Sequence, residues 1–157
     1  MIIIAHRGLT DGPDKLLQNN PGQVQRALDM GFDAEIDVWF IDGKYFLGHD
    51  TPDYEVKWNW LTQPNLWMHC KNLPAFFDMR SRTVIHNYFW HENDAVVLTS
   101  RGNIWTFFGK PATASPESIC VMPEVSYNWN EIEKLVNSDK WMGVCTDYPI
   151  RVQQCLK

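Results

Sequence analysis

Short apolar runs recur along the chain, separated by polar and turn-forming residues. Ile2–Ala5 is apolar throughout, which is typical of a strand buried on both faces, as in parallel sheets. Asn20 is placed to cap a helix whose first residue is Pro21, and Gly31 ends that helix. Residues 32–39 form the next β-prone run. The pattern therefore predicts a right-handed parallel strand–helix–strand unit.

The later apolar segments predict further strands and two more helices. Strands are expected over 44–47, 66–71, 83–89, 95–99, 104–108, 118–122 and 141–146. Helices are expected over 73–80 and 130–136, and loops over 9–20, 51–64 and 110–116. Since no repeat, low-complexity segment or linker interrupts this series, residues 1–157 are predicted to form a single domain.

About eight strands of parallel character favour the α/β class and a (β/α)8 barrel of the TIM type. Such barrels usually take ~250 residues, whereas this chain has 157 residues. The chain leaves about 20 residues for each unit, while a strand–helix–strand unit needs ~30 or more. We therefore expect a reduced barrel in which several helices are short or missing.

Composition excludes some classes of partner. The net charge of −5 argues against a nucleic-acid partner, which would favour a basic surface. No apolar run approaches the ~20 residues of a membrane span, and the first run is too short for the core of a signal peptide. The four cysteines show no paired spacing, which predicts reduced thiols and a cytoplasmic location.

Two acidic residues in the second strand point to chemistry. Glu35 and Asp37 are two positions apart, so both carboxylates lie on one face of the strand. Carboxylates this close repel each other unless a proton or a cation lies between them. A tight turn at 42–43 and the return strand 44–47 bring His49 toward the pair. The alternative is that the pair belongs to the solvated face of an antiparallel ribbon.

Several short motifs occur together in a particular order. They are His6-Arg7-Gly8, Asn20-Pro21, Glu35-x-Asp37, Gly48-His49-Asp50 and Cys145-Thr146-Asp147-Tyr148-Pro149. In this order and spacing they resemble the glycerophosphodiester phosphodiesterase family, which belongs to the phosphatidylinositol-phospholipase-C-like barrels. The resemblance is dense over residues 1–50 and sparse afterwards.

The resemblance implies a metal-dependent phosphodiester hydrolase. Its substrate would be a glycerophosphodiester-like or sugar-phosphodiester molecule, either a small molecule or a lipid headgroup. Glu35 and Asp37 would bind one divalent cation, Mg²⁺ or Ca²⁺. His6 and His49 would be the acid–base pair, and Arg7 would bind the phosphate through its planar guanidinium.

The strand at 66–71 departs from the family pattern. The family has an acidic metal ligand two residues before a lysine, whereas this chain has His69 before Lys71. Lys71 matches the phosphate-stabilising lysine. His69 takes the position of the third acidic ligand, where an imidazole suits Mn²⁺ better than Mg²⁺ or Ca²⁺. Three readings stay open: His69 is a ligand, Glu124 supplies the carboxylate instead, or the metal binds weakly.

Each candidate also has a simpler structural role. A histidine at a strand end, such as His6, can bind a backbone carbonyl. Arg7 can form an internal salt bridge to Glu35 or to the other carboxylate of the pair, and Lys71 can pair with Glu35. Two roles fit Asp147, which can orient a histidine or cap a turn. The sequence alone does not choose between these roles.

Two other functions compete with the metal-dependent hydrolase. The missing helices and His69 fit a non-catalytic barrel that binds a phosphate ligand. A metal-independent cyclising enzyme of the phospholipase type would use a cationic side chain in place of the metal ion. The attacking group, a hydroxyl of the substrate or water, is not decided by the sequence.

Overall fold

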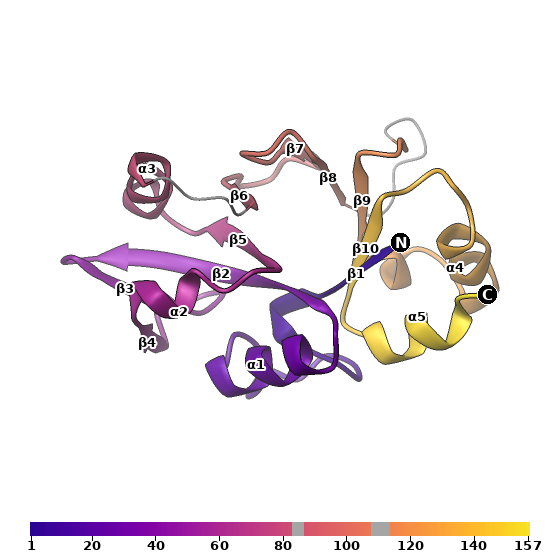
Figure 1. Cartoon of the computed structure of the whole chain (residues 1–157), viewed down its shortest axis with the longest axis horizontal. Coiled ribbons are helices and arrows are strands. Elements are labelled where there is room, and N and C mark those ends of the chain that lie inside the picture. The colour runs from indigo at the N-terminus through magenta and orange to yellow at the C-terminus, as the bar shows by residue number, and fades with distance from the viewer. Residues whose placement is uncertain (83–86, 108–113) are drawn as a thin grey trace.

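One curled, mixed sheet dominates the computed structural model, which describes residues 1–82, 87–107 and 114–157 (Figure 1). Ten strands of the described residues make up this sheet. They are β1 (Ile2–Ala5), β2 (Asp33–Ile41), β3 (Lys44–Leu47), β4 (Tyr54–Val56), β5 (Leu66–Cys70), β6 (Asn87–Phe89), β7 (Val96–Leu98), β8 (Ile104–Phe107), β9 (Ser118–Val121) and β10 (Gly143–Thr146).

The strand order places the first and last strands side by side. The main path runs β4-β3-β2-β1-β10-β9-β8-β7, and β5 pairs with the other edge of β2 and with β6. Strands β1, β2, β5, β6, β8, β9 and β10 are joined by parallel pairings, whereas β3, β4 and β7 pair antiparallel. Ala5 lies opposite Thr146, so the residues that follow them leave the sheet together.

Bulky side chains fill the concave face of the curled sheet. Trp105 of β8 packs against Trp67 of β5 and Phe89 of β6, with ring centroids 5.7 and 4.8 Å apart. Ile4 and Ile119 belong to the same buried cluster. Across the remaining gap, the backbone N–H of Ser100 donates to the carbonyl of Tyr88 at 2.8 Å.

The expected reduced (β/α)8 barrel is wrong. The described residues form a half-barrel of ten strands with five short α-helices, and three of its strands run antiparallel. Hairpins explain the difference, because β2–β3–β4 and β7–β8 are joined by turns rather than by crossover helices. A hairpin needs only a few residues between strands, so a chain of this length reaches ten strands without eight helices.

The helices cover the convex face of the sheet. They are α1 (Pro21–Asp29), α2 (Trp58–Leu61), α3 (Leu73–Ser81), α4 (Trp129–Val136) and α5 (Pro149–Cys155), with short 3-10 turns at His6–Gly8 and Pro123–Val125. Asn20 caps α1 by accepting from the N–H groups of Gly22 and Gln23. Helices α4 and α5 pack near β1 and β10, whereas α3 packs against β2 and β5 (Figure 1).

Most of the expected elements are confirmed, with shifts of one or two residues at their ends. The loop expected over 51–64 is wrong, because it contains β4 and α2. Helix α5 was not expected, although Pro149 lies at its first turn, where proline is favoured. Residues 83–86 of one expected strand, residue 108 of another and residues 110–113 of one expected loop lie outside the described residues.

The four cysteines are free, as the sequence predicted. Burial raises the pKa of Cys70 and Cys120 to about 12, so these thiols stay protonated at neutral pH. Within the described ranges, none of the helices combines the length and the apolar character that crossing a membrane requires.

Gly48, directly after β3, occupies a position that only glycine fits. Its φ is +150°, and a Cβ there would lie 1.9 Å from the carbonyl oxygen of Thr51. Gly48→Ala is therefore expected to lower the free energy of unfolding by about 2–4 kcal/mol. Gly43→Ala is the matched control, since Gly43 also has a positive φ but no atom within 4 Å of its Cβ position. Denaturant unfolding of both variants measures the difference, and equal stabilities would contradict this packing.

Candidate functional site

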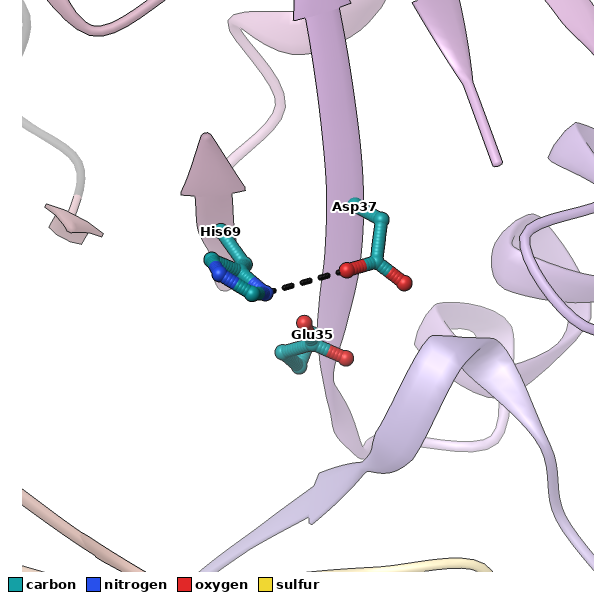
Figure 2. Close-up of side chains that lie close together, drawn as sticks. All are labelled: Glu35, Asp37 and His69. Atoms are coloured by element: carbon teal, nitrogen blue, oxygen red, sulfur yellow. Dashed lines mark hydrogen bonds and ion pairs between the residues drawn. The ribbon is translucent and has the colours of Figure 1, made fainter. Parts of the chain in front are cut away.

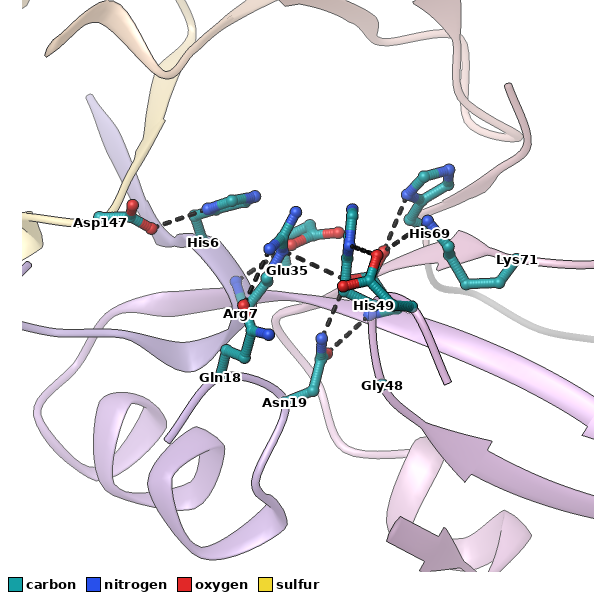
Figure 3. Close-up of polar contacts among 12 residues, drawn as sticks. His6, Arg7, Gln18, Asn19, Glu35, Gly48, His49, His69, Lys71 and Asp147 are labelled. Carbon is teal, nitrogen blue, oxygen red and sulfur yellow. Dashed lines mark hydrogen bonds and ion pairs between the residues drawn. The ribbon is translucent and has the colours of Figure 1, made fainter. Parts of the chain in front are cut away.

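Polar side chains gather at the ends of β1, β5 and β10 and along the first half of β2 (Figure 3). His6 and Arg7 follow β1 directly, in a 3-10 turn. Arg7 has φ 52° and ψ 26°, a left-handed conformation that is rare for a residue with a side chain. Its backbone N–H donates to Glu35 Oε2 at 3.0 Å. Strained backbone of this kind is frequent at functional sites.

His6 is oriented by Asp147. His6 Nδ1 lies 2.7 Å from Asp147 Oδ1, and both side chains are largely buried. The parallel pairing of β1 with β10 places them together, although they are 141 residues apart. Burial would lower the pKa of His6, but the hydrogen bond to Asp147 and the charge of Glu35 outweigh it and raise the pKa above its usual value. The role of orienting a histidine, one of two considered for Asp147, is confirmed.

Glu35 and Asp37 share the concave face of β2, as their spacing predicted. Their exposed fractions are 3% and 1%, so the alternative of a solvated ribbon face is wrong. Burial and the neighbouring Asp37 charge raise the pKa of Glu35. Two buried carboxylates this close need a proton or positive groups around them.

Positive groups surround Asp37 in particular. Burial would raise the pKa of Asp37, but His69 Nδ1 at 3.0 Å, Lys71 Nζ at 3.5 Å and Arg7 Nε at 3.4 Å lower it. Asn19 also donates to Asp37 Oδ2 at 2.9 Å and accepts from the backbone N–H of Asp37. The salt bridge considered for Arg7 is confirmed, and Lys71 pairs with Asp37 rather than with Glu35.

Glu35, Asp37 and His69 bring three side chains of metal-binding type together (Figure 2). Each offers one ligand atom, and these atoms lie within 4.8 Å of one another. His69 also has partners within the protein, because its Nε2 lies 3.4 Å from the carbonyl oxygen of His91 and the two imidazole rings stack at 4.5 Å. Binding of a cation through His69 would therefore compete with these contacts.

His49 reaches the same site from the loop after β3. Gly48 anchors that loop, since its carbonyl accepts from Trp39 Nε1 at 2.7 Å and its N–H donates to the Asp37 carbonyl at 3.2 Å. His49 Nδ1 lies 2.7 Å from Asp50 Oδ1. Partial burial lowers the pKa of His49, the opposite direction to His6. The loop thus brings a second histidine with a different protonation preference to the carboxylate pair.

These side chains enclose a pocket of about 400 Å³. The predicted residues that line it are His6, Arg7, Glu35, Asp37, His49 and His69. Asp147 and His91 line it as well, whereas Lys71 reaches the site through Asp37. Glu124 lies behind the site, where its Oε1 accepts from the Thr146 hydroxyl at 2.7 Å and from the Asp147 N–H at 2.9 Å.

Sequence reasoning missed Asn19 and His91. Asn19 is fully buried and has φ 57°, a conformation that asparagine tolerates better than most residues. Its only signal in the sequence is a position next to the helix cap Asn20. His91 lies two residues after β6, and His6 lies directly after β1. A histidine close to the end of a strand is therefore the sequence feature that could have identified His91.

Comparison with known proteins adds no relative. No protein-family model matches the chain, and no curated protein matches it either.

Proposed function

We propose that this protein is a phosphodiester hydrolase that works by acid–base catalysis. The observation that carries the proposal is the His6–Asp147 pair, which faces the same pocket as Glu35, Asp37 and Arg7. Phosphodiester cleavage needs a proton donor, a proton acceptor and positive charge near the phosphate oxygens. The pocket offers all three, and the reaction agrees with the one implied by the resemblance to glycerophosphodiester phosphodiesterases.

The two histidines are assigned different roles. His6 has a raised pKa, so it favours the protonated form and acts as the acid that protonates the leaving oxygen. His49 has a lowered pKa, so it favours the neutral form and acts as the base that takes a proton from the attacking water. The new P–O bond forms as the bond to the leaving oxygen breaks. Environments that separate the pKa values of two such groups are a recurring basis for acid–base assignments.

Positive side chains bind the phosphate. Arg7 lines the pocket, and its Nη1 donates to Gln18 Oε1 at 2.9 Å, which fixes the plane of the guanidinium. A guanidinium held in one plane can donate two parallel hydrogen bonds to a phosphate. Lys71, on the far side of Asp37, adds a second positive charge.

Glu35, Asp37 and His69 would hold a divalent cation. Two carboxylates and one imidazole fit a metal such as Mn²⁺ better than Mg²⁺ or Ca²⁺, which prefer oxygen ligands. The electrostatics of Glu35 support the fit, because its burial beside a second carboxylate favours a positive ion there. A bound cation supplies positive charge to the non-bridging phosphate oxygens.

A metal-independent reaction is the second candidate. The contacts of Asp37 favour it, because Arg7 and Lys71 already provide positive partners for this carboxylate, and His69 lies within hydrogen-bond distance of it. In that case the side chains alone offset the phosphate charge, and a hydroxyl of the substrate is the attacking group. The third possibility, a phosphate-binding protein without catalysis, predicts binding of phosphate esters and no turnover.

Metal removal separates these possibilities. We expect turnover of bis(p-nitrophenyl) phosphate to fall to background after treatment with a chelator, and to return on addition of Mn²⁺ more than of Mg²⁺, because one ligand is an imidazole. The metal-independent reaction needs an ester with its own hydroxyl, so 2-hydroxypropyl p-nitrophenyl phosphate is assayed in parallel, and its turnover in the presence of chelator would select that reaction. Absence of turnover with every metal tested would contradict the hydrolase.

A variant of His69 tests its place in the cation site. His69→Asp adds an oxygen ligand and a negative charge, so it is expected to shift the preference from Mn²⁺ toward Mg²⁺. His69→Asn is the matched control, since it removes the imidazole without adding charge. Titration calorimetry with both ions gives the affinities, and unchanged affinities in His69→Asp would place this side chain outside the coordination shell.

A further inference from the structure

The pocket has two walls of different chemistry. One wall is formed by β2, β5 and the segments that follow β1, β3, β6 and β10, and it carries the charged and imidazole side chains described above together with Asp94. The other wall comes from β8, β9 and the turn after β9. Its residues are Trp105, Phe107, Val121, Met122 and Val125, and we call it the apolar wall.

The curl of the sheet sets these walls against each other. In the strand order, β8 and β9 lie beyond β10, whereas β2 and β5 lie on the other side of β1 (Figure 1). The rings of Trp105 and Trp67 nevertheless come within 5.7 Å of each other, which shows that β8 and β5 approach across the concave face. A ligand whose phosphate lies at Arg7 and His6 therefore has the apolar wall beside it.

The outer part of the apolar wall remains open to solvent. Val125 is 58% exposed and Phe107 is 39% exposed, although both line the pocket. Valine and phenylalanine side chains have no group that can bind a hydroxyl. A glycerol or sugar moiety held there would lose hydrogen bonds to water and gain none from these side chains. An apolar moiety would instead remove apolar surface from water, which is favourable.

We propose that the apolar wall binds an alkyl or aryl substituent carried on the phosphate ester, in place of a glycerol or sugar group. The inference rests on the proposed function, in that it takes the charged wall to bind the phosphate. The volume of about 400 Å³ lies within the range of pockets that bind small molecules. The occupant is thus a phosphate ester with a short apolar chain or ring lying toward Val125.

Binding of simple phosphate monoesters tests the inference without relying on turnover. Methyl, butyl and hexyl phosphate share one charged group and differ only in apolar length. We expect affinity in titration calorimetry to rise along this series, with hexyl phosphate binding at least about tenfold more tightly than methyl phosphate. Val125→Asn should reduce that ratio severalfold. Leu98→Asn is the matched control, because Leu98 is 70% exposed and lies outside the pocket lining.

The outcomes separate this inference from the proposed function. Three results would each overturn the apolar wall as a binding site. They are equal affinities for methyl and hexyl phosphate, no binding of either, and an equal fall of the hexyl-to-methyl affinity ratio in Val125→Asn and Leu98→Asn. Turnover is measured in parallel with methyl and hexyl p-nitrophenyl phosphate. Binding that depends on chain length without turnover of either ester supports the inference and contradicts the hydrolase. Turnover together with equal affinities for the methyl and hexyl monoesters supports the hydrolase and contradicts the inference.

Discussion

His6→Ala is expected to lower kcat by about 10²–10⁴, the usual contribution of a general acid or base. The variant removes the proton donor and leaves Asp147 without its partner at 2.7 Å. His49→Ala should have an effect of similar size, because it removes the base. Lys44→Ala is the control, since Lys44 forms an exposed salt bridge with Glu55 and lies outside the pocket lining. Turnover of an aryl phosphodiester and thermal melting are measured on all three.

The pH dependence of kcat/KM should assign each histidine to one limb of a bell-shaped profile. His49 must be neutral, and its pKa is lowered, so activity falls only when the pH drops through a value below the usual ~6.5. His6 must be protonated, and its pKa is raised, so activity falls when the pH rises through a value above ~6.5. The profile is therefore broad between the two. Residual activity of His49→Ala should lack the acidic limb, and a flat wild-type profile would count against the pair.

Glu35→Gln is expected to abolish metal-dependent turnover and leave the melting temperature nearly unchanged. Glu35 is buried beside Asp37, and its raised pKa means that its negative charge is unfavourable there. A neutral amide at this position therefore removes no stabilising charge. Asp37→Asn should abolish turnover as well, but it leaves Arg7, Lys71 and His69 around a neutral group. Removing one partner of a buried ion pair costs about 3–5 kcal/mol. The two variants should thus differ in stability and agree in activity.

Glu55→Gln is the control for this pair of variants. Glu55 forms an exposed salt bridge with Lys44 at 3.0 Å, and exposed pairs contribute little to stability. Wild-type turnover in both Glu35→Gln and Asp37→Asn would refute the cation site. Equal stability of Asp37→Asn and wild type would show that the fold does not need the negative charge of Asp37 to balance the positive groups around it.

Local structure was largely predictable from the sequence. Apolar runs ending at a polar residue located β1, β2, β5 and β9, and the caps Asn20 and Asn128 belong to helices that were expected from apolar spacing. The segment 51–64 carries no periodic signal of helix or strand, because β4 has only three residues and α2 only four. Elements this short contain too few residues for a period to be recognised.

The arrangement of the strands was not predictable to the same degree. A run of apolar residues does not reveal whether its strand pairs parallel or antiparallel. The expected barrel assumed parallel strands, but β7 returns directly into β8 through a turn. The length of the chain correctly predicted that helices would be few. The expectation that the strands would still close into a (β/α)8 barrel was wrong.

The sequence predicted which residues belong to the site better than it predicted the contacts between them. Alternation along β2 and β5 gave the shared faces of Glu35 with Asp37 and of His69 with Lys71, because a period of two depends only on local geometry. Partners such as Asn19 and His91 come from loops, whose paths depend on packing between distant segments. The sequence therefore indicated the residue types that line the pocket without showing that Asp37 is its most contacted carboxylate.

The side-by-side arrangement of β1 and β10 has a consequence for folding. His6 and Asp147 are separated by 141 residues, so their contact closes a loop of nearly the whole chain. Contacts of such long range are entropically costly to form and slow the folding of a domain. The hairpin of β2 and β3, by contrast, needs only a local turn and can form early. During synthesis, the carboxylates of β2 emerge long before Asp147, so the nascent chain acquires the His6–Asp147 contact only after β10 has joined the sheet.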